Sequence, residues 1–149
     1  MSDFSVFVSD ALQAKIKWLA NQQYPREYGG ILTGLKTSVG WVLVDVEVPD
    51  DWQASPTQFT RQVDRLNAYL SQLYTISEGQ LHYLGEWHSH PDGSTTYSQQ
   101  DARSIAEISL EPGVKNATPL LWIVRSGATT AHQLYIWRQN KLHSLTYNE

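Results

Sequence analysis

Two histidines, a serine and an aspartate lie close together in residues 84–101, whose sequence is LGEWHSHPDGSTTYSQQD. An apolar strand is expected to lead into His88 and His90, and because strand side chains alternate between faces, both imidazoles should project to the same side. A turn at 91–93 and a helix beginning at Ser98 would bring Asp101, in the first turn of that helix, toward the imidazoles. Two nitrogens and one carboxylate oxygen can then bind the same metal ion.

The ligand set of His88, His90 and Asp101 would leave one tetrahedral position around a zinc ion for water. Three protein ligands and one open position are typical of catalytic zinc, whereas structural zinc usually has four protein ligands and is often rich in cysteine. The chain has no cysteine, which also excludes a disulfide framework and a cysteine nucleophile. We therefore expect one zinc ion per chain.

Ordinary structural roles also account for these residues when each is taken alone. A His-x-His pair by itself does not distinguish a metal site from surface or core histidines. Ser98 and Asp101 suit the N-cap and the N3 acid of a helix, which satisfy free amides and the helix dipole. The combination in one segment, with a proline, a glycine and a polar turn between strand and helix, favours the metal site.

The segment resembles the JAMM motif of the JAB/MPN zinc metalloproteases, in which His-x-His precedes Ser-x-x-Asp at the same spacing. That family also has an upstream glutamate shortly before a glycine-rich apolar strand, and Glu27 in REYGGILTG (26–34) matches it. The resemblance spans residues 27–137 and points to the stand-alone prokaryotic JAB domains. It implies an α+β fold with a curved mixed sheet flanked by helices, similar to the cytidine-deaminase architecture.

The resemblance also implies a role for each matching residue. His88, His90 and Asp101 would bind zinc, Glu27 would carry a proton from water to the leaving amine, and Ser98 would donate to the developing oxyanion. Glu86 competes with Glu27, because it has the same strand parity as the two histidines. Its distance along the strand from His90 instead favours a supporting role beside the ligands, or no role beyond that of a strand acid.

The activity implied by the resemblance is hydrolysis of the isopeptide or peptide bond after the C-terminal tail of a ubiquitin-like modifier. The partners would be that modifier, its conjugates and E1-like and E2-like conjugation enzymes, including those of bacterial antiphage systems. The tail would bind in extended form beside the motif strand. Two alternatives stay open: a peptidase or amidase acting on a small peptide or sulfur-carrier adduct, and a non-catalytic scaffold or DNA-repair-associated JAB relative.

Composition agrees with a small enzyme. The chain has 149 residues, which suits a single domain over 1–149 with one core. Its 41% hydrophobic residues and six tryptophans exclude a disordered chain, and its net charge of −4 provides no broad basic face for nucleic acid. Neither a signal peptide nor an apolar run long enough to cross a membrane is visible, so we expect a cytoplasmic protein without a membrane partner.

Hydrophobic periodicity predicts about six strands and three helices, with the motif strand at the centre of the sheet. One helix is expected to begin at Ser9 and to carry Leu12, Ile16 and Leu19 on its buried face. The strand at 41–48 should alternate, with Val42, Val44 and Val46 on one face. Residues 49–60 are a candidate substrate rim, with a plain connector as the alternative.

Overall fold

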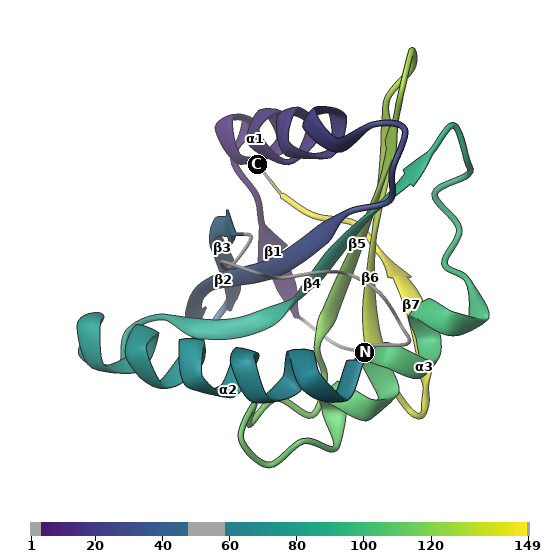
Figure 1. Ribbon diagram of the computed structural model, residues 1–149. Coiled ribbons are helices and arrows are strands. Elements are labelled where there is room, and N and C mark those ends of the chain that lie inside the picture. Colours follow the sequence, from purple (N-terminus) through teal and green to yellow (C-terminus); the bar gives the residue numbers. More distant parts are fainter. Residues whose placement is uncertain (1–3, 48–58, 149) are drawn as a thin grey trace.

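The motif strand is the central strand of a seven-stranded sheet in a computed structural model that describes residues 4–47 and 59–148 (Figure 1). The strand order is β1-β3-β2-β4-β5-β6-β7, which confirms the central position of the motif strand, β4. The expected count of about six strands falls one short. The strands are β1 (Ser5–Phe7), β2 (Gly29–Thr37), β3 (Gly40–Glu47), β4 (His82–Pro91), β5 (Leu120–Ser126), β6 (Ala131–Arg138) and β7 (Lys141–Leu145).

Parallel and antiparallel pairs are mixed in this sheet, as the α+β prediction requires. Strands β1 and β3 pair in parallel, as do β4 and β5, and all other neighbours are antiparallel. A parallel pair needs a long crossover connection. The crossover between β4 and β5 contains the helix α3 (Gln99–Ser109), so the end of β4 and the start of α3 belong to one continuous stretch of chain.

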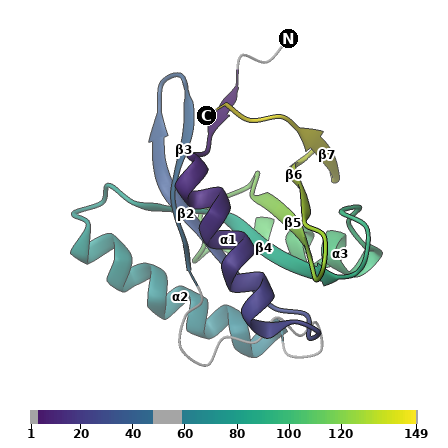
Figure 2. The ribbon, with the colours of Figure 1, turned by 90° about the horizontal axis from the view of Figure 1, so that it is seen from above.

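One face of the sheet is covered by a single helix, α1 (Asp10–Gln23), which lies across the strands (Figure 2). As predicted, Ser9 is its N-cap: the Ser9 hydroxyl accepts a hydrogen bond from the amide of Leu12 at 3.1 Å. The buried stripe consists of Leu12, Ile16 and Ala20, whereas Leu19 is only partly buried at the edge of the core. These side chains join one apolar cluster with Val6, Val8, Leu32, Leu43, Val46, Leu84, Trp87, Leu120, Trp122, Val124, Leu134 and Ile136.

The other face is covered by two helices, α2 (Phe59–Ile76) and α3, which lie on the opposite side of the sheet from α1 (Figure 1). Its apolar residues form two separate clusters. The first contains Ile31, Tyr83, Ile108 and Val114, and the second contains Ile105, Leu121, Ile123, Tyr135 and Leu142. Helix α3 contributes to both clusters, which therefore meet near the centre of the sheet along β4.

The expected alternation of the valines in β3 is wrong at Val44. Val44 is 46% exposed, while Leu43 and Val46 are both buried. Gly34 pairs with Leu43 and Thr33 pairs with Asp45, so Val44 is an extra residue in β3 without a partner on β2. Such a bulge turns the side chains that follow it to the other face and breaks the simple alternation.

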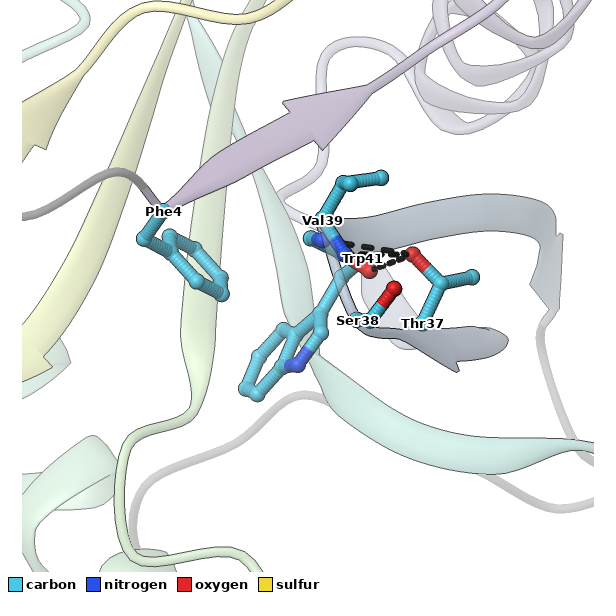
Figure 3. Close-up of a pocket in the computed structure, with 6 residues that line it drawn as sticks. Phe4, Thr37, Ser38, Val39 and Trp41 are labelled. Atoms are coloured by element: carbon cyan, nitrogen blue, oxygen red, sulfur yellow. Dashed lines mark hydrogen bonds between the residues drawn. The ribbon is translucent and has the colours of Figure 1, made fainter.

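The turn between β2 and β3 lies at the far end of β2 from the motif. Near it, Phe4 packs edge-to-face against Trp41 with ring centroids 5.0 Å apart, and the Lys36 ammonium lies 5.2 Å from the centre of the Trp41 ring. The aromatic rings and the turn residues line a cavity of about 280 Å³. Figure 3 shows these lining residues. The β2–β4 pairing places Gly29, not this turn, beside His88, so the cavity is separate from the motif.

No helix in the described part of the chain is long and apolar enough to cross a membrane. The candidate substrate rim at 49–60 lies outside the described residues except for its last two, with which α2 begins.

Candidate active site

His88 and His90 lie on the same face of β4, and Glu86 lies there with them. In the pairing with β5, Glu86 is opposite Leu121 and His88 is opposite Ile123, and both of these partners belong to the core beneath α3. The prediction that the two imidazoles share one face is therefore confirmed. That face is the one covered by two helices, and the motif lies where the two apolar clusters meet.

Asp101 is drawn to the imidazoles by the first turn of α3. The Ser98 hydroxyl accepts a hydrogen bond from the Asp101 amide at 3.0 Å, and the Asp101 carboxylate accepts one from the Ser98 amide at 2.9 Å. This reciprocal capping box confirms the structural role that was the alternative for these two residues. The Asp101 carboxylate can accept further hydrogen bonds, because its two oxygens have more lone pairs than the capping box uses.

The remaining capacity of Asp101 is used by both histidines. Its Oδ1 lies 2.9 Å from Nδ1 of His88, and its Oδ2 lies 3.2 Å from Nε2 of His90. The outer ring nitrogens also have oxygen partners: His88 Nε2 lies 3.3 Å from Oε1 of Glu86, and His90 Nδ1 lies 2.9 Å from the carbonyl oxygen of Ser94. The structure thus brings together the three predicted metal ligands.

The electrostatics of this cluster follow from its hydrogen bonds. Burial alone would lower the pKa of His88, but hydrogen bonds and charges from Asp101 and Glu86 outweigh it and raise that pKa to about 10. The hydrogen bond to Asp101 raises the pKa of His90, with further contributions from the Ser94 carbonyl and the charge of Glu27. Burial would raise the pKa of Asp101, but the two imidazoles hold it well below its usual value.

The donor set fits zinc by its chemistry. Carbonyl and carboxylate oxygens can only accept, and the raised pKa values of both rings favour a proton on each imidazole nitrogen in these contacts. One dication between Asp101 and the rings would replace the two inner protons with the same total charge. No group of three or more His, Asp or Glu side chains within residues 4–47 and 59–148 is already arranged as a metal site, since imidazoles and carboxylate are in direct contact instead. Two imidazoles and a carboxylate are a common zinc ligand set.

Glu27 reaches the same end of β4 from the neighbouring strand. It is exposed and lies two residues before Gly29, the first residue of β2, which pairs with His88. The Tyr28 amide donates to the Ser89 hydroxyl and the Ser89 amide donates to the Tyr28 carbonyl, both at 2.8 Å. These bonds place Glu27 close enough for its charge to raise the pKa of His90.

Sequence reasoning missed the contribution of Ser89. Its side chain is buried on the opposite face from the imidazoles, where it anchors the segment that carries Glu27. The strand alternation that placed His88 and His90 on one face also places the residue between them on the other. That parity was the available signal for an anchoring role, although nothing in the sequence names Tyr28 as the partner.

The turn after His90 has two further anchors that the sequence did not reveal. The Tyr24 hydroxyl donates to the Asp92 carboxylate at 2.6 Å, and the Arg125 side chain donates from Nε to the Gly93 carbonyl at 2.7 Å. One anchor comes from the segment before Glu27 and the other from β5. Together they hold the turn between the histidines and α3 from both sides.

Strand β4 ends in His-x-His, and an aspartate from the next helix is bonded to both rings. This arrangement agrees with the family to which the sequence assigns the chain. The chain belongs to the Prok-JAB family, the prokaryotic homologs of the JAB domain, whose sequence profile matches residues 9–139. This match covers most of the chain and confirms the family predicted from the motif.

One relative and two solved structures are also similar to this chain. A CD-NTase/cGAS isopeptidase from Enterobacter hormaechei subsp. hoffmannii is 29% identical over 136 residues, which cover 89% of this chain and 69% of that protein. The solution structure of a Desulfitobacterium hafniense protein has a TM-score of 0.59 at 16% identity, covering 95% of this chain and 90% of that one. The crystal structure of a JAB1/MPN domain protein from Archaeoglobus fulgidus has a TM-score of 0.53 at 15% identity, covering 99% and 97%. The two structures confirm the predicted fold.

Proposed function

We propose that this chain is a zinc-dependent isopeptidase that hydrolyses the bond after the C-terminal tail of a ubiquitin-like modifier. The observation that carries the proposal is the double contact of Asp101, whose two carboxylate oxygens each meet one imidazole of the His-x-His pair. The bond type is supported by the relative that is named an isopeptidase. By the same likeness, the modified target would be a protein of the CD-NTase/cGAS class, within a bacterial antiphage conjugation system.

His88, His90 and Asp101 are the residues that would hold zinc. Zinc in such a site lowers the pKa of water to roughly 7 and polarises a carbonyl. The protein's own contribution is to fix the ligands before the ion arrives. The capping box orients Asp101, and the oxygen atoms of Glu86 and Ser94 orient the two rings from outside.

Glu27 is proposed as the proton carrier. The amide bond is broken by water: the hydroxyl part joins the carbonyl carbon, and the proton that water loses must reach the departing nitrogen. An exposed carboxylate at the mouth of the site can accept that proton and return it to the amine. Glu27 meets this requirement because it lies two residues before β2, close enough for its charge to raise the pKa of His90. The products are the carboxylate of the modifier tail and the free amine of the target.

Ser98 is proposed to stabilise the oxyanion. In the capping box its oxygen acts only as an acceptor, from the Asp101 amide. The hydroxyl proton therefore remains available to donate to a substrate oxygen. The capping role and the catalytic role are thus compatible in one side chain, and a donor of this kind contributes about 10²–10³ in rate.

The modifier tail is proposed to bind in extended form beside the end of β4. Strand β4 is paired with β5 throughout 85–91, and with β2 up to His88. The tail would lie beside the end of β4 that β2 does not reach, on the side where Glu27 lies. Binding there would bring the scissile bond past the imidazoles and the proton carrier together.

The test uses the purified chain and a ubiquitin-like precursor that has extra residues after its terminal glycine. We expect a shorter product at zinc loading, no product after chelation, and recovery of activity when zinc is returned. The His88→Ala protein serves as the control and should be inactive. Cleavage that survives chelation would contradict zinc dependence. A zinc-loaded protein that cleaves small peptides but no precursor or conjugate would favour the peptidase alternative.

A further inference from the structure

Glu86 is a carboxylate in a place where the fold would be served equally well by an apolar side chain. It is only 3% exposed. Its neighbour across β2 is Ile31 and its neighbour across β5 is Leu121, and both are fully buried. A carboxylate in such surroundings is costly unless it has a polar partner.

His88 is a hydrogen-bond partner of Glu86, whose charge also helps burial to raise the pKa of the Tyr83 hydroxyl. Oε1 of Glu86 lies 3.3 Å from the ring nitrogen of His88 that points away from Asp101. The other side of the ring is bonded to Asp101. His88 is therefore held between two carboxylates, one from its own strand and one from α3, while its side chain is 17% exposed.

His90 has a matching arrangement made from different groups. Its inner nitrogen contacts Asp101, and its outer nitrogen meets the carbonyl oxygen of Ser94. In both rings the outer nitrogen faces an oxygen that can only accept, so that nitrogen must carry the proton. When an imidazole is neutral it has one proton, and fixing that proton on one nitrogen leaves the other nitrogen free as a metal donor.

We propose that Glu86 is a positioning residue for His88: its carboxylate holds the proton and the orientation of the ring, and so assigns the inner nitrogen to the metal. This inference rests on the proposed zinc site. The Ser94 carbonyl does the same for His90 as a backbone group. Substitution can remove the Glu86 carboxylate but not the Ser94 backbone carbonyl. The proposal can therefore be tested at Glu86.

The competing account gives Glu86 a structural role, as a countercharge to the His88 imidazolium in the metal-free fold. The two accounts differ in what they expect of Glu86→Leu, which replaces the carboxylate by a side chain suited to its neighbours. If Glu86 positions His88, the folded Glu86→Leu protein should bind zinc more weakly than the unsubstituted protein. A purely structural role changes the melting temperature and leaves the zinc affinity of the folded protein as it was.

The experiment measures zinc affinity by competition with a chelator of known affinity, well below the melting temperature of each variant. We expect Glu86→Leu to bind zinc about 10–100-fold more weakly than the unsubstituted protein. Glu86→Gln should stay within about threefold, because its amide oxygen still accepts from the ring. The matched control is Glu107→Leu, which places leucine at an exposed carboxylate of α3 outside the site and should have no effect. Equal zinc affinity for Glu86→Leu and the unsubstituted chain would overturn the proposal.

A second readout does not need zinc. In metal-free protein with ¹⁵N-labelled histidine, the outer nitrogen of His88 should show a slowly exchanging proton by NMR, present also in Glu86→Gln and lost in Glu86→Leu. If that proton is missing from the unsubstituted chain, the proposal is wrong whatever the metal content. The failure of the proposed function would look different: zinc binding and its dependence on Glu86 would stand, but no modifier would be cleaved.

Discussion

The two faces of the sheet differ: one carries only core packing, and the other also carries the candidate active site. Under α1 the side chains form one uninterrupted apolar cluster. Under α2 and α3 the apolar side chains fall into two clusters, and Glu86, His88, His90 and Asp101 lie where these meet. One helix across a sheet closes that face, whereas two helices leave a junction between them. This fold can therefore place charged side chains near the sheet centre without opening its main core.

The junction also gives the site partial access to solvent. The His88 and His90 side chains are each 17% exposed and the Asp101 side chain is 11% exposed, so they are shielded from water without being sealed. The neighbouring residue Trp87, which points to the other face, is fully buried. Adjacent positions on β4 thus contribute to stability or to the site, but not to both. Substitutions on one face should therefore change stability, and substitutions on the other should change metal binding or activity.

The largest effect is expected for the ligands themselves. His88→Ala or Asp101→Asn removes one of three protein ligands, so most of the zinc should be lost while the α1 face stays intact. Elemental analysis of the purified proteins measures this. A full complement of metal in His88→Ala would show that the ligand assignment is wrong.

Trp87→Ala should produce the opposite pattern. It leaves a cavity in the core under α1, for which we expect a loss of about 3–5 kcal/mol in the free energy of unfolding. Urea unfolding of the metal-free protein gives this value. The zinc affinity of the molecules that remain folded should stay near that of the unsubstituted chain, and a parallel loss of zinc affinity would mean that the two faces are not independent.

Glu27→Gln should separate proton transfer from metal binding. The substitution keeps the size of the side chain and all three ligands, so zinc content and melting temperature should be unchanged while turnover falls at least about 10²-fold. Glu86→Gln is the control and should keep its metal and most of its activity. An inactive Glu86→Gln beside an active Glu27→Gln would show that the two glutamates have been assigned each other's roles.

A smaller effect is expected at Ser89, which anchors the Tyr28 backbone beside Glu27. Ser89→Ala leaves the Tyr28 amide without its hydroxyl acceptor, which should cost about 1–3 kcal/mol in unfolding free energy. Glu27 would also be held less firmly, so turnover should fall about tenfold with zinc content unchanged. Ser89→Thr keeps the hydroxyl and is the matched variant. Equal turnover for Ser89→Ala and the unsubstituted chain would mean that Glu27 does not depend on this anchor.

Local geometry explains why part of the site was visible in the sequence. Strand alternation is enough to place His88 and His90 on one face, and capping preferences are enough to place Asp101 in the first turn of α3. Glu27 came only from the family resemblance, because its approach depends on the β2–β4 register between residues distant in the chain. The bulge at Val44 and the burial of Glu86 between β2 and β5 depend likewise on which strands become neighbours. No pattern within either strand specifies that.

The short separation between the histidines and Asp101 has a consequence for the order in which the site is assembled. His88 and Asp101 are 13 positions apart, whereas the bond that anchors the Glu27 segment joins residues 61 positions apart. Closing a short loop costs less chain entropy, and contacts near in sequence tend to form sooner during folding. We expect a refolding chain to become able to capture metal before the proton carrier arrives. Metal uptake would then mark an early stage of refolding, and the first turnover would mark its completion.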